Sequence, residues 1–283
     1  MYQSMAHSID YTLFQEIFKK EGVISMNIHQ IRNATIVVEY AGKKFLIDPM
    51  FAEKGTLPAF GSDVGLPPAP RQDQKNPLVS LPMSIENIIS NVNAVIVTHL
   101  HLDHWDEAAI KVLPKDIKVF AQNEEDALEI KNAGFQNVEV LQENTVFEGI
   151  QLIKTKAEHG RGEILQHAGH TCGVIFKHAD EKPLYVAGDT VWYDAVKEVI
   201  DTHKPEIIVL NAGDNQFLVG GSLIMGKDDV YEVVKAAPNA KIVAVHMEAV
   251  NHWGLSRDEL KSFINEKGIS NVLVPDDGES YSF

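Results

Sequence analysis

The most constraining feature of the chain is a cluster of histidines and aspartate that directly follows an apolar segment. Residues 92–98 are predicted to form a buried strand, and His99, His101, Asp103 and His104 follow within six positions. The ends of strands are where α/β proteins place ligand-binding groups. An extended backbone would put His99 and His101 on one side, while Asp103 and His104 turn toward a second position. The cluster therefore predicts a metal site, with one short loop able to serve two ions.

Composition limits what else can bind the metal. The 283 residues include twelve histidines but one cysteine, Cys172. A single cysteine excludes an intrachain disulfide, a zinc ribbon or an iron–sulfur cluster within one chain. We therefore expect histidine and carboxylate ligands, a buried structural role for Cys172, and a cytoplasmic location.

Charge and hydropathy narrow the class of partner. The formal net charge is −15 at pH 7, which repels phosphate backbones and anionic membranes at long range. The chain lacks an apolar run near the ~20 residues that a membrane span requires, and residues 1–20 do not resemble a signal peptide. We expect a small-molecule substrate, no long nucleic acid and no membrane. The sequence leaves open whether the protein forms a homo-oligomer.

The first third of the chain combines strands with irregular segments. Residues 10–20 show the periodicity of a short amphipathic helix, within an N-terminal extension of about residues 1–25. Residues 34–40 and 43–47 are predicted to form a hairpin that ends at Asp48. The segment at about 55–82 is rich in proline and glycine and is predicted to be a long loop, either a lid over the site or a surface excursion.

After residue 92, predicted strands alternate with helices. Asn123 is a predicted N-cap, and Ser256 with Glu259 forms a capping-box pattern. Three further apolar strands are predicted at 184–187, 207–210 and 242–245. This order predicts a layered α/β fold. Because no strong linker divides the chain, residues 1–283 are interpreted as one domain.

The other candidate ligands also follow predicted strands. Asp189 follows 184–187, His246 follows 242–245, and His159 follows the partly alternating segment 151–157. A lone histidine is more often structural than a ligand, so each is weak evidence alone. His159 also has alternatives nearby in the sequence, namely His167, His170 and His178.

Taken in order, these motifs resemble the metallo-β-lactamase superfamily. The matching features are THLHLDH at 98–104, a later histidine, Gly-Asp-Thr at 188–190 and a last histidine after a strand. Asp48 matches the early buried aspartate of that family. The resemblance covers about residue 28 to the C-terminus, and it is strongest to the branch that contains the ascorbate-6-phosphate lactonase.

The resemblance implies a four-layer αββα sandwich with two divalent metal ions at one edge, zinc or manganese, with iron as an alternative. It also implies seven ligands in three groups. The first ion would be held by His99, His101 and His159, the second by Asp103, His104 and His246, and both by a bridging Asp189. Asp48 would support the ligands without binding metal. His252 has an open role, either supporting the site, contacting substrate or lying in a surface loop.

The expected activity is hydrolysis of a small ester, lactone or phosphoester by a metal-bound hydroxide, with Asp103 orienting this nucleophile as a catalytic group. Two alternatives share the fold: a phosphodiesterase or nuclease, and an iron-binding redox protein. A metal-binding protein without catalysis is less favoured, because the ligand set leaves positions open around two ions, as catalysis requires.

Overall fold

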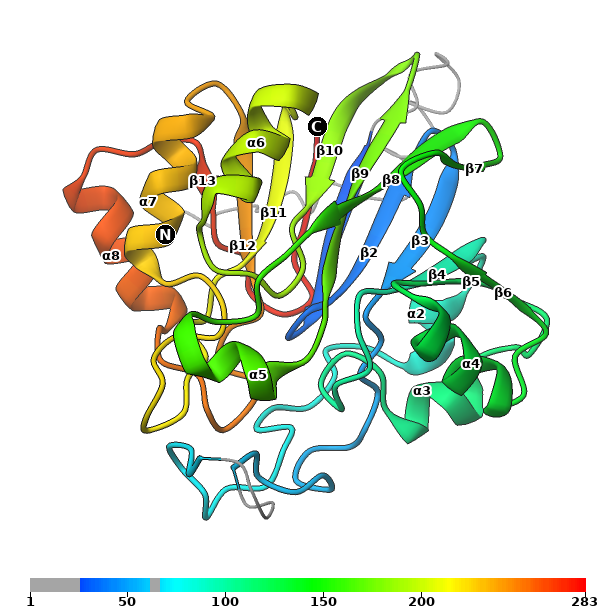
Figure 1. Cartoon of the computed structure of the whole chain (residues 1–283), viewed down its shortest axis with the longest axis horizontal. Coiled ribbons are helices and arrows are strands. Elements are labelled where there is room, and N and C mark those ends of the chain that lie inside the picture. The colour runs from blue at the N-terminus through cyan, green and yellow to red at the C-terminus, as the bar shows by residue number, and fades with distance from the viewer. Residues whose placement is uncertain (1–25, 62–66) are drawn as a thin grey trace, which may run out of the picture.

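The computed structural model describes residues 26–61 and 67–283, so the predicted helix at 10–20 and the N-terminal extension lie outside the described residues. Two seven-stranded sheets pack face to face, and helices cover their outer faces (Figure 1). This is the predicted four-layer αββα sandwich. Within the described residues, no helix has the length and apolar character needed to cross a membrane.

The first sheet mixes antiparallel and parallel strands. Its order is β14 (Ser280–Ser282), β1 (Asn27–Arg32), β2 (Thr35–Tyr40), β3 (Lys43–Ile47), β4 (Ala94–Val97), β5 (Lys118–Ala121) and β6 (Asn137–Val140). Strands β2 and β3 form the predicted hairpin, and β3 to β6 run parallel. The C-terminal strand β14 completes the edge beside β1.

The second sheet has the same number of strands and a similar division. Its order is β13 (Val272–Leu273), β12 (Lys241–Val245), β11 (Ile207–Asn211), β10 (Glu181–Val186), β9 (Cys172–His178), β8 (Ile150–Lys156) and β7 (Thr145–Phe147). Strands β10 to β13 run parallel, whereas β7 to β10 pair antiparallel. Cys172 is a buried strand residue, as predicted.

Helices cover the outer face of each sheet (Figure 1). The first sheet carries α2 (Ile85–Ile89), α3 (Glu107–Val112) and α4 (Glu124–Asn132), and the second carries α6 (Asp194–His203), α7 (Lys227–Ala236) and α8 (Arg257–Glu266). A short 3₁₀ turn, η1 (Gly162–Ile164), leads into α5 (Leu165–Ala168). Asn123 caps α4, and Ser256 with Glu259 forms the predicted capping box of α8.

Strand periodicity explains why the sheets stack. In β11, Ile207 and Val209 pack into the core between the sheets, whereas Ile208 and Leu210 pack against the helices of the second sheet. In β4, Ile96 faces the same central core and its neighbours face the helices of the first sheet. Successive side chains of a strand point to opposite faces, so each sheet is buried on both sides, as strands in parallel sheets are.

This topology brings several loops to one edge of the sandwich. Asp48 follows β3, and residues 99–104 follow β4. The loops after β8, β10 and β12 carry His159, Asp189 and His246. Because parallel strands end on the same side, residues more than a hundred positions apart meet there.

Candidate metal centre

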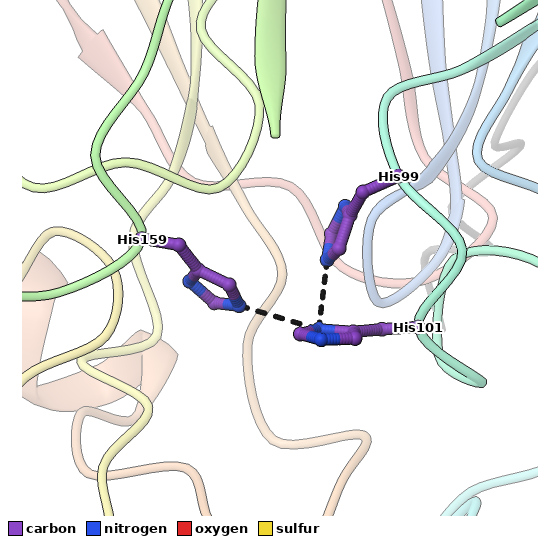
Figure 2. A group of neighbouring side chains, drawn as sticks. All are labelled: His99, His101 and His159. Carbon is purple, nitrogen blue, oxygen red and sulfur yellow. Dashed lines mark hydrogen bonds between the residues drawn. The ribbon is translucent and has the colours of Figure 1, made fainter. Parts of the chain in front are cut away.

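Three histidines form the first group at this edge. Nε2 of His99 lies 2.9 Å from Nδ1 of His101, and Nε2 of His159 lies 3.3 Å from the same Nδ1. His159 approaches from the loop after β8, opposite the loop that carries the other two (Figure 2). His159 is buried, and its Nδ1 lies 3.0 Å from the carbonyl oxygen of Leu223. A hydrogen bond from Nδ1–H to that oxygen would leave Nε2 free as a metal ligand.

A second group lies beside the first. Nε2 of His246 is 3.2 Å from Oδ2 of Asp103 and 3.1 Å from Nε2 of His104. The amides of His104 and Trp105 both donate to the carbonyl of His101, a turn that redirects the chain between the two groups. The sequence-based expectation that one short loop serves two positions therefore agrees with the geometry.

Asp189 lies between the two groups. Its Oδ2 is 3.5 Å from Nε2 of His159 and 3.2 Å from Nε2 of His104, and its Oδ1 is 3.7 Å from Nε2 of His246. Candidate ligand atoms within 4.8 Å of one another form the sets His99–His101–His159, His99–His104–Asp189 and Asp103–His104–His246. The structure thus brings together all seven predicted ligands, with the aspartate placed to bridge.

Asp48 lies behind the candidate ligands. One of its carboxylate oxygens accepts from the Thr98 amide at 2.7 Å, and the other lies 2.9 Å from Nδ1 of His104. Asp48 and His246 both have positive φ values, 48° and 62°. Non-glycine residues rarely adopt this region, and strain of this kind concentrates at functional sites. The strained backbone at these two positions directs the side chains of Asp48 and His246 toward the centre.

Electrostatics distinguish the histidines of the centre. Burial, together with neighbouring His159, lowers the pKa of His101 to about 4, and burial with His104 and His101 lowers the pKa of His99 well below its usual value. Burial also opposes protonation of His104, but Asp189, Asp103 and Asp48 outweigh it and raise the pKa of His104 well above its usual value. His99 and His101 are therefore neutral at pH 7, as metal ligation requires.

Histidines of the centre balance the negative charges of the two buried carboxylates, Asp103 and Asp189. Burial alone would raise the pKa values of Asp103 and Asp189, yet histidines, His104 first, hold both well below the usual range. All ion pairs of these two aspartates in the described chain are with histidines. Buried carboxylates whose ion-pair partners are all histidines, without a fixed lysine or arginine among them, are chemically suited to divalent cations.

Two asparagines support the aspartates and were not predicted. Asn211 donates to Oδ1 of Asp189 at 2.6 Å, and Asn33 donates to Oδ2 of Asp103 at 3.2 Å. Asn211 ends β11, so the rule of polar residues at strand ends could have found it. Asn33 lies in the turn between β1 and β2, and no sequence pattern distinguishes it.

A cavity of ≈ 240 Å³ opens against the centre. His101, Asp103, His159 and Asp189 form its inner part. The rest of its lining is mostly apolar or aromatic: Pro58, Phe60, Leu100, Leu102, His167, Ala168, Phe217, Leu223 and His252. Neither lysine nor arginine occurs among the described residues of this lining, so its polar character comes from the centre itself and two further histidines.

Two loops contribute to this lining, the proline-rich loop through Pro58 and Phe60 and the loop before α7 through Phe217 and Leu223. Buried Asn251 anchors the first of these loops. It exchanges hydrogen bonds with Phe60 and Asn76 and donates to the Pro70 carbonyl.

Histidines outside the two groups have other positions. His167 is exposed at the cavity, while His170 and His178 belong to neither group. Trp192 and Tyr193 pack against the hydrophobic cluster under α6 and α7. His252 is buried in the cavity wall, where its ring lies 5.0 Å from that of Phe60. The structure therefore places His252 in the cavity rather than in a surface loop.

Comparison with known proteins agrees with this architecture. Residues 43–247 match the family model described as "Beta-lactamase superfamily domain". The chain is 68% identical over 260 residues to the UPF0173 protein YddR of Bacillus subtilis, covering 91% of this chain and 100% of that protein.

Two solved structures are also similar. An isothiocyanate hydrolase from Delia radicum gut bacteria is 44% identical with a TM-score of 0.85, covering 91% of this chain and 99% of that one. A possible metal-dependent hydrolase from Veillonella parvula DSM 2008 is 40% identical with a TM-score of 0.87, covering 92% and 100% respectively.

Proposed function

This chain belongs to the β-lactamase superfamily, and we infer that it is a metal-dependent hydrolase whose centre holds two divalent cations, zinc or manganese. The carrying observation is the position of Asp189, whose Oδ2 lies 3.5 Å from Nε2 of His159 in the first group and 3.2 Å from Nε2 of His104 in the second. His99, His101 and His159 would hold one ion, and Asp103, His104 and His246 the other. When bound, the ions supply the Lewis acidity that lowers the pKa of water and polarises the substrate.

We propose that the substrate is a small, uncharged electrophile of the isothiocyanate class, R–N=C=S. A phosphoester would bring negative charge into a cavity whose described lining offers neither lysine nor arginine. A neutral heterocumulene with an apolar R group suits the wall formed by Phe60, Phe217, Leu100 and Leu223. The 44% identical isothiocyanate hydrolase supports this choice over the ester and lactone expected from sequence.

Different residues of the chain would orient the attacking water, bind the substrate and hold the ligands in position. Asp103 lines the cavity and lies within 3.2 Å of Asn33 and of His246, so it is placed to orient the attacking water. The apolar lining excludes bulk water and holds the R group, which directs the central carbon of the substrate toward the centre. Asp48 and Asn211 keep His104 and Asp189 in position.

A substrate panel tests this proposal. Full-length protein loaded with zinc or manganese would be assayed with benzyl isothiocyanate, phenyl acetate, a homoserine lactone and a phosphodiester, with release of amine and carbonyl sulfide measured for the first. We expect turnover of the isothiocyanate, lost in His101→Ala and retained in the remote variant His178→Leu. Exclusive turnover of the lactone or phosphodiester would overturn the substrate class. Equal turnover by His101→Ala would overturn the site.

A further inference from the structure

The segment that follows β11 reaches both ligand groups. Asn211 donates to Oδ1 of Asp189 at 2.6 Å, and the amide nitrogen of Asn215 lies 3.4 Å from Nδ1 of His246. Both asparagines are buried. One short segment therefore contacts the aspartate that is placed to bridge and the last candidate ligand of the second group.

This segment lies close against the loop that carries His246. The amide of Ala212 donates to the carbonyl of Val245 at 2.9 Å. A Cβ atom at Gly213 would lie 2.2 Å from the carbonyl oxygen of His246, a distance that real Cβ atoms essentially never show. Because glycine lacks this atom, the two backbones can approach each other and Asn215 is held beside the His246 ring.

Three other candidate ligands have an oxygen atom beside Nδ1. The pairs are His99 with the Thr98 hydroxyl at 3.3 Å, His104 with a carboxylate oxygen of Asp48 at 2.9 Å, and His159 with the Leu223 carbonyl at 3.0 Å. A neutral imidazole that binds metal through Nε2 carries its proton on Nδ1 and needs an acceptor there. His246 differs from these three, because its Nδ1 faces the amide nitrogen of Asn215.

The side-chain amide of Asn215 can supply the missing acceptor by a half-turn. Its Oδ1 is buried and has no hydrogen-bond partner among the described residues. The half-turn only exchanges the positions of the amide oxygen and nitrogen, which are nearly equal in size. The oxygen can accept the Nδ1 proton of His246, whereas the NH₂ group would place donor against donor. Metal binding at Nε2 of His246 therefore favours the exchanged orientation.

We propose that Asn215 positions His246 for metal binding by accepting the Nδ1 proton of its ring through Oδ1. This inference rests on the proposed metal centre. Nε2 of His246 lies 3.2 Å from Oδ2 of Asp103 and 3.1 Å from Nε2 of His104, where the second ion would bind. A hydrogen bond at Nδ1 fixes the orientation and tautomer of the ring and raises the basicity of Nε2. Asn215 does not line the cavity and acts through His246, so it is a positioning residue.

The second neighbour of the amide does not compete with this role. Nε2 of His252 also lies 3.4 Å from the amide nitrogen of Asn215. After the exchange, the oxygen faces both imidazoles. A carbonyl oxygen has two lone pairs, so it can accept from His246 and from His252 at the same time.

Zinc affinity tests the proposal. Full-length wild type, Asn215→Leu and Asn215→Asp would be titrated with zinc against a chromophoric chelator. Leucine has about the size of asparagine but no acceptor, so we expect it to weaken the binding of one ion by about tenfold to a hundredfold. Aspartate presents an oxygen to the same N–H group and should keep the affinity within about threefold of wild type. Asn265→Leu, at an exposed position of α8, is the matched control.

A double variant identifies which ion is affected. His159→Ala removes a ligand of the first ion and leaves the ligand set of the second ion complete. Adding Asn215→Leu to His159→Ala should therefore weaken the binding of the remaining ion by the same factor as in the single variant. An unchanged affinity of that ion would overturn the proposal.

The ring proton of His246 gives a second readout, which wild type alone can supply. Protein labelled with ¹⁵N in histidine and asparagine would be loaded with zinc, and the His246 signal identified by its loss in His246→Asn. We expect a proton on Nδ1 of His246 that exchanges slowly with water, and that shifts and exchanges faster in Asn215→Leu. An unprotonated Nδ1 would overturn the proposal. So would a strong nuclear Overhauser cross-peak between this proton and the side-chain NH₂ of Asn215, because it would show the unexchanged amide.

The outcomes separate this inference from the proposed function. Neither measurement depends on turnover, so both remain decisive if the substrate panel fails. Wild type that binds no zinc would reject the proposed metal centre and this inference with it. Equal weakening by Asn215→Leu and Asn215→Asp would show a merely structural role and overturn the inference alone, as would equal zinc affinities of wild type and Asn215→Leu.

Discussion

Oδ2 of Asp48 lies 2.9 Å from Nδ1 of His104, and the same carboxylate accepts hydrogen bonds from the amide and hydroxyl of Thr98. The aspartate thus joins the end of β3 to the loop of residues 99–104 after β4. It fixes the His104 ring so that Nε2 faces Asp103 and Asp189. Groups that hold a ligand histidine in this way commonly change metal affinity tenfold to a hundredfold when removed.

Replacing Asp48 should therefore weaken metal binding without removing a ligand. We expect Asp48→Asn to lower zinc affinity by about tenfold to a hundredfold, because the neutral amide is a weaker acceptor for Nδ1–H. Competition with a chromophoric chelator would measure the change. Asp180→Asn, an exposed aspartate far from the ligands, is the control. Unchanged zinc affinity in Asp48→Asn would show that His104 is oriented by other contacts.

Asp189 should be needed for both ions, since its oxygens face both ligand groups. We expect Asp189→Ala to bind at most one ion per chain and to lose at least about a hundredfold in turnover, because a bridging charge is removed. Metal content of dialysed protein by mass spectrometry checks the first part. Two tightly held ions in the variant would contradict the bridging position.

The choice among neighbouring histidines gives a matched comparison. His159 faces His101 and Asp189 from within the fold, whereas His170 is exposed and outside both groups. His159→Ala should lose the first ion, and His170→Ala should keep the wild-type metal content. The same dialysis experiment measures both. The opposite pattern would mean that the segment around α5 rearranges when metal binds.

His252 should make stability depend on pH in the acidic range. Its folded pKa, about 3, lies below the ordinary value of 6.5, mainly because of burial. The unfolded chain therefore binds a proton first, so this contribution is complete above pH 6.5 and is lost as pH falls toward 3. We expect wild type to lose about 1.4 kcal/mol per pH unit more than His252→Leu well below pH 6.5. Urea unfolding at pH 7 and pH 5, with a chelator in both, measures this difference, and identical slopes would place His252 in a wetter environment.

Asn251 does not line the cavity, but it should stabilise the proline-rich loop that forms part of the cavity wall. Its side chain and amide bind Phe60, Pro70 and Asn76, all in the proline-rich loop. Removing several buried hydrogen bonds, as in Asn251→Ala, should cost about 2–3 kcal/mol of stability. It should also raise KM more than it lowers kcat, because Phe60 lines the cavity and is not among the candidate metal ligands. Thermal unfolding and steady-state kinetics would be compared with the surface variant Asn265→Ala, and an unchanged KM would show that the loop is held by other contacts.

Much of the fold could be predicted because it depends on local pattern. Alternation predicted the hairpin of β2 and β3, apolar runs predicted β4 and β10 to β12, and cap residues predicted the starts of α4 and α8. The edge pairing of β1 with β14 joins residues about 250 positions apart. No local pattern specifies such a pairing, and it was not predicted.

The sequence by itself determined which side chains are available at the centre. Histidines and aspartates placed directly after strands were recognisable because parallel strands end at one edge of a sheet. Only the tertiary structure decided how they divide into groups and what surrounds them. The selection of His159 over its neighbours and the support from Asn33 depend on packing between distant segments. So do the contacts of Asn215 with His246 and His252 and the mostly apolar wall of the cavity. Such contacts arise from the relative position of two sheets, which the period of one strand does not specify.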